Sequence, residues 1–143
     1  MNKENQTYKK SILLAEGFPA GRKIMKEILD LLGYNYKTAD TGYEVIMVLK
    51  NEKFDLILLD LELPQFDGFE TIEHIRRNFD YPENAIPVIA MTNKDFSSDF
   101  NQTYKEEGFD GLIIKPFSLD ELDKTIKDVL FRPEKSEKKV FSK

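Results

Sequence analysis

Apolar residues gather in five short runs along the chain, and each run is a candidate strand. The clearest is Leu56 to Leu59, which ends at Asp60 and is followed by two loop signals, Pro64 and the pair Asp67-Gly68. A continuous apolar run of this length is typical of a strand buried on both faces of a parallel sheet. The other four runs are residues 11–15, 34–38, 86–91 and 112–114.

Segments with helical periodicity separate these runs. Pro19 begins the first segment and Gly33 ends it, because proline suits the first turn of a helix and glycine the position just past its end. Capping-box spacing marks the starts of two more helices, at residues 41–44 and 118–121. The other two helices carry apolar residues at helical spacing, Phe69, Ile72, Ile75 and Phe79 in one and Phe96, Phe100 and Tyr104 in the other. This alternation predicts an α/β fold with a parallel sheet and helices on both faces.

The length and charge of the chain narrow the possible functions. The chain has 143 residues, which suits one domain. We expect a flexible N-terminal arm at residues 1–10, the folded domain at 11–131 and a charged tail at 132–143. A net charge of −5 argues against direct binding of nucleic acid, and no apolar run approaches the length of a membrane span. The absence of cysteine suits a reducing compartment, so we expect a cytoplasmic protein.

Polar residues that can carry chemistry follow four of the predicted strands. They are Glu16, Asp60, Thr92 and Lys115. Right-handed crossovers bring the carboxyl ends of parallel strands to one edge of the sheet, so these side chains should face one crevice. Taken alone, Asp60 is equally well explained as the cap of the next turn, and Thr92 as a turn residue. The single histidine, His74, gives no support to a histidine-rich metal site or to Ser-His-Asp chemistry.

Four motifs together resemble the receiver domain of response regulators, the CheY-like family. They are ILLAE at residues 12–16, DLILLDLELP at 55–64 with Asp67-Gly68, IPVIAMT at 86–92 and IIKPF at 113–117. The resemblance implies a flavodoxin-like, doubly wound sheet of five parallel strands in the order 2-1-3-4-5 with five helices. It also implies a signalling module in a two-component system, at most self-phosphorylating and slowly self-dephosphorylating, and not a turnover enzyme.

The resemblance implies a role for each site residue. Asp60 resembles the aspartate that accepts a phosphoryl group from a histidine kinase or a phosphotransfer protein. Lys115 resembles the lysine that pairs with that group, and Thr92 resembles the switch hydroxyl. Transfer of a phosphoryl group onto a carboxylate needs cations nearby, because one anion otherwise meets another. Lys115 supplies one cation, and Mg²⁺ held by carboxylates is expected to supply the second.

One residue departs from the family pattern in the predicted metal site. Two adjacent acids usually follow the first strand in this family, and this chain has Glu16-Gly17. The missing acid is the family's direct metal ligand, so we expect Mg²⁺ to bind weakly, through Glu16, Asp60 and Glu62. Glu62 has a plainer interpretation as a solvated loop acid.

The sequence also bears on how a signal would leave the domain. The resemblance implies a partner-binding face made of the last strand and its two flanking helices, which would contact a downstream protein. Leu112 stands where the family often has an aromatic residue, so aromatic gating is not expected. We expect the helix after Thr92 to be the easiest to shift, because its apolar stripe is narrow. We also expect a Glu62–Lys94 pair to cover the site in part.

Two other functions compete with phosphoacceptor signalling. Gly17 favours a phosphorylation-independent pseudo-receiver, a protein-interaction domain that no longer holds a metal. Asp60, Thr92 and Lys115 together favour the phosphoacceptor, because a chain without phosphoryl chemistry has no physical need for all three. A hydrolase with an aspartyl nucleophile resembles a pattern with a second aspartate two residues later, and this chain has Glu62 there.

Overall fold

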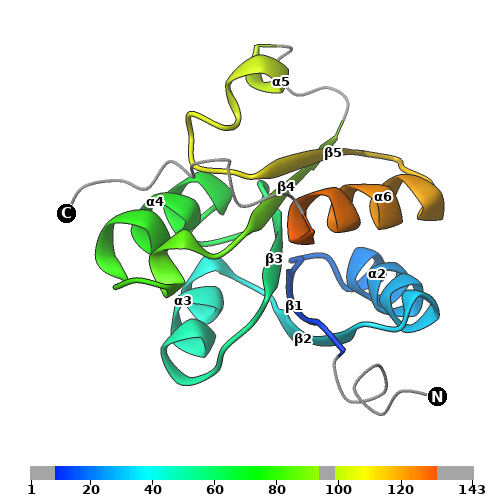
Figure 1. Cartoon of the computed structure of the whole chain (residues 1–143), viewed down its shortest axis with the longest axis horizontal. Coiled ribbons are helices and arrows are strands. Elements are labelled where there is room, and N and C mark those ends of the chain that lie inside the picture. Colours follow the sequence, from blue (N-terminus) through cyan, green and yellow to red (C-terminus); the bar gives the residue numbers. More distant parts are fainter. Residues whose placement is uncertain (1–8, 94–98, 132–143) are drawn as a thin grey trace.

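The computed structural model describes residues 9–93 and 99–131 of the chain. Within these residues, five strands form one parallel sheet with the order β2-β1-β3-β4-β5, and helices cover both faces (Figure 1). The strands are β1 (Ser11–Ala15), β2 (Asn35–Ala39), β3 (Leu56–Asp60), β4 (Val88–Asn93) and β5 (Gly111–Lys115). The helices are α2 (Pro19–Leu32), α3 (Gly42–Asn51), α4 (Gly68–Asn78), α5 (Phe100–Thr103) and α6 (Leu119–Leu130), with a 3₁₀ turn, η1 (Glu83–Ala85). The predicted strand order and the five helices are confirmed.

The expected boundaries of the domain stay predictions. Residues 1–8 of the expected arm and the whole expected tail, 132–143, lie outside the described residues. Across the ranges that the structure does describe, none of the helices has the length and apolar character needed to cross a membrane.

The sheet separates two hydrophobic cores because side chains alternate between its faces along each strand. α2 and α6 cover one face, and α3 and α4 cover the other (Figure 1). The α2–α6 core receives the strand residues Ile12, Leu14, Leu56, Leu58, Ile89, Met91 and Ile113. The α3–α4 core receives Leu13, Ala15, Ala39, Ile57, Leu59, Val88 and Ala90. The same alternation decides which face each site residue takes at the carboxyl end of its strand.

Helix ends follow the sequence signals with two differences. Ser118 and Glu121 form the complete capping box that was predicted for α6. At α3, Thr41 accepts from the N–H of Glu44, but the Glu44 carboxylate turns to the N–H of Asp40. α4 begins with a second complete capping box, between Asp67 and Glu70, where the sequence analysis recognised only a loop. The pair Asp67-Gly68 therefore marks both the loop after β3 and the start of α4.

Two helices differ from the predicted pattern. The apolar residues of α2 are spaced as a wide stripe in the sequence, but the helix buries only Met25 and Leu29 fully and leaves Ile24 and Leu31 exposed. The reason is that α2 and α6 share one face of the sheet, so each helix contributes a narrow stripe. α5 has four residues, and of its predicted stripe Phe96 lies outside the described residues. Phe100 is nevertheless buried, with its ring 5.4 Å from that of Phe69.

A buried arginine joins α4 to the segments around it. Arg76 is 1% exposed. Its guanidinium donates to the carbonyl oxygens of Gly108, Asn84 and Ile86, at 2.8 to 3.0 Å. It also lies 3.1 Å from the carboxylate of Asp110. One side chain thereby holds the chain before β4 and the chain before β5 against the same helix.

Candidate functional site

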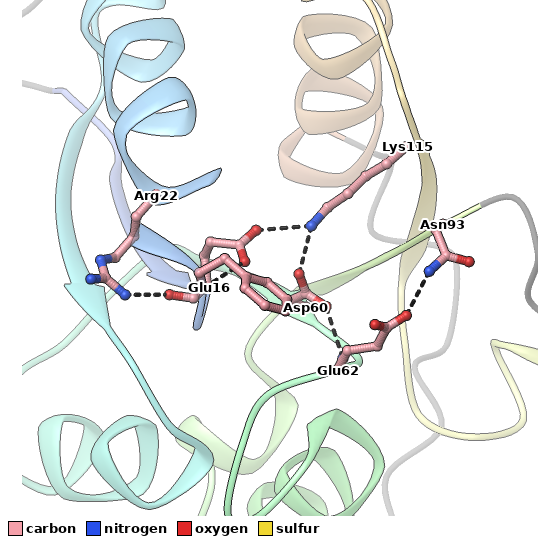
Figure 2. Close-up of polar contacts among 7 residues, drawn as sticks. Glu16, Arg22, Asp60, Glu62, Asn93 and Lys115 are labelled. Atoms are coloured by element: carbon pink, nitrogen blue, oxygen red, sulfur yellow. Dashed lines mark hydrogen bonds and ion pairs between the residues drawn. The ribbon is translucent and has the colours of Figure 1, made fainter. Parts of the chain in front are cut away.

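Three charged side chains meet at the carboxyl edge of the sheet. Ala15 pairs with Leu59 in the parallel register, so Glu16 and Asp60 are neighbours. Glu16 continues the alternation of Ile12 and Leu14, and Asp60 that of Leu56 and Leu58, so both face the side of α2 and α6. Lys115 ends β5 and follows Ile113 in the same alternation. The predicted convergence of Glu16, Asp60 and Lys115 is what the structure shows (Figure 2).

Lys115 bridges the two carboxylates. Its Nζ lies 2.6 Å from Oδ2 of Asp60 and 2.8 Å from Oε1 of Glu16. Burial lowers the pKa of Lys115, but its hydrogen bonds to Asp60 and Glu16 outweigh burial, and the pKa is raised. Burial raises the pKa of Glu16, and the bond to Lys115 offsets only part of that effect. The ammonium therefore stays charged and holds two buried acids together.

The backbone after β3 holds Asp60 from the other side. The N–H of Glu62 donates to Oδ1 of Asp60 at 2.8 Å. Asp60 is 3% exposed, yet both of its oxygens have donors, as a buried carboxylate requires. Lys115 and this backbone bond fix the orientation of the carboxylate.

The carboxylate of Glu62 does not join Glu16 and Asp60. Its Oε2 accepts from the side-chain amide of Asn93 at 2.6 Å, away from the two buried acids (Figure 2). Glu62, the expected third metal ligand, therefore does not direct its carboxylate at the site. Its backbone N–H donates to Asp60, and its side chain accepts from Asn93. Lys94, the other half of the predicted covering pair, lies outside the described residues, so that pair stays a prediction.

Gly17 lies where the family usually carries a second acid, and the ring of Pro64 takes up the space that a side chain would need. A Cβ on Gly17 would lie 2.6 Å from Cδ of Pro64 and 3.3 Å from the carbonyl oxygen of Asp40. Over residues 9–93 and 99–131, no cluster of three or more histidine, cysteine, aspartate or glutamate side chains is arranged to hold a metal ion. The site offers two neighbouring carboxylates.

Thr92 occupies the opposite side of the sheet edge. It lies one residue past Met91, the register partner of Asp60. It continues the alternation of Val88 and Ala90, so it faces the α3–α4 core, as Leu112 does. Its hydroxyl is buried and has no hydrogen-bond partner within the part of the chain that the structure describes. A polar atom in this state is free to take a new partner without breaking an old bond.

Sequence reasoning missed three residues near the site. Arg22 donates to the carbonyl oxygen of Glu16 at 2.9 Å (Figure 2). The Arg22 guanidinium also lies 3.0 Å from the carboxylate of Asp40. Gly21 lies against the carboxylate of Glu16. Asn93 holds Glu62. The spacing of Gly21 and Arg22 after Glu16, within the first turn and a half of a helix, was the available signal.

Comparison with known proteins agrees with this geometry. Residues 12–127 match the family model of the response regulator receiver domain. The chain belongs to this family. The probable transcriptional regulator ycf27 of Porphyridium aerugineum is 34% identical over 128 residues, which cover 90% of this chain and 51% of the regulator. This receiver domain thus spans about half the length of the ycf27 regulators that it matches.

Solved structures also resemble this receiver domain. The receiver domain of the sensor histidine kinase PA1611 from Pseudomonas aeruginosa PAO1 has a TM-score of 0.77 and 25% identity, over 87% of this chain and 99% of that one. Its crystal structure has a magnesium ion coordinated in the active-site cleft. The chemotaxis protein CheY4 of Vibrio cholerae has a TM-score of 0.76 and 27% identity, over 86% of this chain and all of that one (100%). The receiver domain is a module of two-component phosphoacceptor signalling, and these relatives do not favour the pseudo-receiver alternative.

Proposed function

We propose that Asp60 is the phosphoacceptor of this receiver domain, with a phosphohistidine of a histidine kinase or phosphotransfer protein as the donor. The observation that carries the proposal is the 2.6 Å contact between Oδ2 of Asp60 and Nζ of Lys115. In the transfer, a carboxylate oxygen of Asp60 forms a P–O bond while the P–N bond to the donor imidazole breaks. The imidazole keeps the electron pair of that bond and takes up a proton.

Charge neutralisation explains why Lys115 belongs to this reaction. The incoming phosphoryl group is anionic, and Asp60 and Glu16 are acids, so the approach is repulsive without a cation. The raised pKa of Lys115 keeps its ammonium charged beside both acids. After transfer, the same ammonium can pair with a phosphoryl oxygen in place of the Asp60 carboxylate. Lys115 thus remains paired before and after the reaction.

The residues present fit a magnesium ion of modest affinity. Mg²⁺ commonly binds proteins through one or two carboxylates and keeps several of its waters. Glu16 and Asp60 supply such a pair, and the magnesium ion in the PA1611 receiver domain lies in the corresponding kind of cleft. When bound, the ion would supply positive charge in addition to that of Lys115 as phosphoryl charge develops. Magnesium affinity is expected to be low for two reasons. Position 17 has no room for an acid, and the Glu62 carboxylate is hydrogen-bonded to Asn93.

We further propose that Thr92 transmits the change to the face made of β5, α5 and α6. The Thr92 hydroxyl, which has no hydrogen-bond partner among the described residues, lies on the strand next to Asp60 and can take a phosphoryl oxygen as its partner. β5 is an edge strand, and Ile114 on it and Leu119 at the start of α6 are partly exposed. An apolar edge of this kind suits contact with a downstream protein, in agreement with the expected partner face.

An adduct experiment tests the assignment of Asp60. The full chain is incubated with a small-molecule phosphodonor and Mg²⁺, and its intact mass is measured. We expect an added mass of one phosphoryl group that Asp60→Asn abolishes. Asp55→Asn is the matched control, because Asp55 precedes the same strand and its carboxylate accepts from the N–H of Ser11 at the opposite edge. This control should keep the adduct.

Two results would contradict the proposal. An adduct that survives Asp60→Asn would place the acceptor elsewhere. The absence of any adduct in the parent protein would favour a phosphorylation-independent interaction domain.

A further inference from the structure

The acid that follows β1 is a glutamate, one methylene longer than aspartate, and its carboxylate lies against the first turn of α2. An added Cβ on Gly21 would be 3.1 Å from Cδ, 3.2 Å from Oε1 and 3.4 Å from Oε2 of Glu16. The carboxyl group therefore lies closer to position 21 than a Cβ normally comes to a neighbour, and a side chain there would require it to shift slightly. Glu16 is 1% exposed, so neighbouring groups and not solvent set the position of its carboxylate.

Other groups at the start of α2 hold Glu16 in this position. The N–H of Phe18 donates to Oε2 at 3.2 Å, and Arg22 donates to the backbone carbonyl oxygen of Glu16 at 2.9 Å. Oε1, which lies as close to position 21 as Oε2 does, accepts from Lys115 at 2.8 Å. The carboxylate therefore spans the distance between α2 and Lys115. We expect an aspartate at this position, one methylene shorter, to lose one of these two contacts.

We propose that Gly21 is a positioning residue for Glu16, so that this pocket is fitted to glutamate and not to aspartate. This inference rests on the proposed function of the site and adds a residue that acts through Glu16. Because glycine has no side chain at position 21, the longer side chain of Glu16 fits beside α2 and its carboxylate reaches Lys115 from there. Replacing either Gly21 or Glu16 alone should therefore weaken the contact between residue 16 and Lys115.

The surroundings decide what a methyl group at position 21 would displace. Gly21, Glu16 and Lys115 line a groove of about 240 Å³ together with Ile24, Met25 and Phe117. A carboxylate pushed by the new methyl group has space on this side, while the backbone of α2 is held by its own hydrogen bonds. We therefore expect Gly21→Ala to fold and to displace the carboxylate from Lys115. Alanine also favours the helix over glycine, so a loss at the site would not come from unfolding.

A double-mutant cycle tests the proposal, with the parent, Gly21→Ala, Glu16→Asp and the double variant of the full chain. The first measurement is the ¹⁵Nζ resonance of Lys115, which reports its ion pair without any phosphodonor. The second is the rate of phosphoryl adduct formation with a small-molecule donor and Mg²⁺. We expect Gly21→Ala to move the resonance and to lower the rate several-fold when residue 16 is glutamate. In the Glu16→Asp background, the same change should alter the rate by less than about twofold, as expected of sites that no longer interact.

The outcomes separate this proposal from the proposed function. Equal effects of Gly21→Ala in both backgrounds, or no effect in either, would overturn the positioning role. A parent protein that forms no adduct would contradict the proposed function, yet the Lys115 resonance would still show whether Gly21 positions Glu16. Thermal unfolding of the four proteins serves as the check that each is folded.

Discussion

The ring of Pro64 closes over Gly17, with Cδ only 2.6 Å from the place that a Cβ on Gly17 would take. Pro64 belongs to the loop that follows β3, and Gly17 to the loop that follows β1. The two loops therefore meet where the family usually places an acid. Glycine at position 17 is thus part of the packing of this site, so Gly17→Asp alone cannot restore the acid without disturbing that packing.

Gly17→Asp is therefore expected to destabilise the domain by about 1–3 kcal/mol, the usual cost of overpacking. Gly17→Ala is the matched control, because it adds the same Cβ without a charge and should cost a similar amount. Pro64→Ala removes Cδ, so Gly17→Asp should be tolerated better in that background and should tighten Mg²⁺ binding there. Urea unfolding gives the stabilities, and amide shifts near Asp60 during a Mg²⁺ titration give the affinities. A Gly17→Asp variant as stable as the parent would contradict the packing argument.

Arg76→Met is expected to destabilise the domain by about 3–5 kcal/mol, since it leaves the buried Asp110 carboxylate without its cation. The variant also leaves the carbonyl oxygens of Gly108 and Ile86 without this donor. Arg77→Met is the control from the next position, where the guanidinium is exposed and pairs with Glu73 on the same helix. That variant should change stability by no more than about 0.5 kcal/mol. Similar unfolding midpoints in urea for the two variants would disprove the anchoring role of Arg76.

The fold could be predicted from the sequence because its signals are local and agree with one another. The apolar run before Asp60 is β3, and Pro19 and Gly33 bound α2 within a residue of the predicted ends. The width of the α2 stripe could not be predicted, because it depends on how α2 and α6 share one sheet face. The short length of α5 likewise could not be predicted from its apolar spacing, because packing sets most of the stability of a helix.

The site could be predicted in part for the same reason. Asp60 and Lys115 end their strands and Glu16 directly follows β1, so the topology alone brings them together. The direction of the Glu62 carboxylate could not be predicted, because Asn93 competes for it at short range. The space around Gly17 and Gly21 depends on loops and a helix start whose positions no sequence pattern specifies.

Thr92→Val should raise the free energy of unfolding by about 1 kcal/mol, because valine removes a buried hydroxyl that has no partner among the described residues. Thr71→Val is the control, since the Thr71 hydroxyl is also buried but donates to the carbonyl oxygen of Asp67 at 2.7 Å. That variant should lower the free energy of unfolding by about 1 kcal/mol. Urea unfolding distinguishes the two signs, and a loss of stability in both variants would mean that the Thr92 hydroxyl is satisfied in solution.

Amide hydrogen exchange should be faster in α5 than in α4 or α6. α5 has four residues, and a helix of one turn leaves most of its amides without partners inside the helix. The buried ring of Phe100 holds the helix in place but does not protect its other amides. Exchange followed by mass spectrometry on peptides from each helix gives the comparison. Protection of α5 equal to that of α6 would show that this helix is not the easiest to shift.

Asn93→Ala is expected to shorten the lifetime of the phosphorylated Asp60 by a few-fold. The bond between Asn93 and Glu62 joins the end of β4 to the loop after β3, directly beside the Asp60 carboxylate (Figure 2). A hydrogen bond of this kind contributes about 0.5–1.5 kcal/mol, which sets the size of the change if its loss lets water reach the site. The lifetime follows from the decay of the phosphoryl adduct by intact mass after the donor is removed.

Substitutions of Glu62 separate the bond from the charge. Glu62→Ala removes the bond and should shorten the lifetime as Asn93→Ala does, with no further change in the double variant, because both remove one shared contact. Glu62→Gln keeps an oxygen that Asn93 can donate to, so it should leave the lifetime near that of the parent. If Glu62→Gln instead shortens the lifetime as much as Glu62→Ala, the carboxylate charge and not the bridge protects the phosphorylated state.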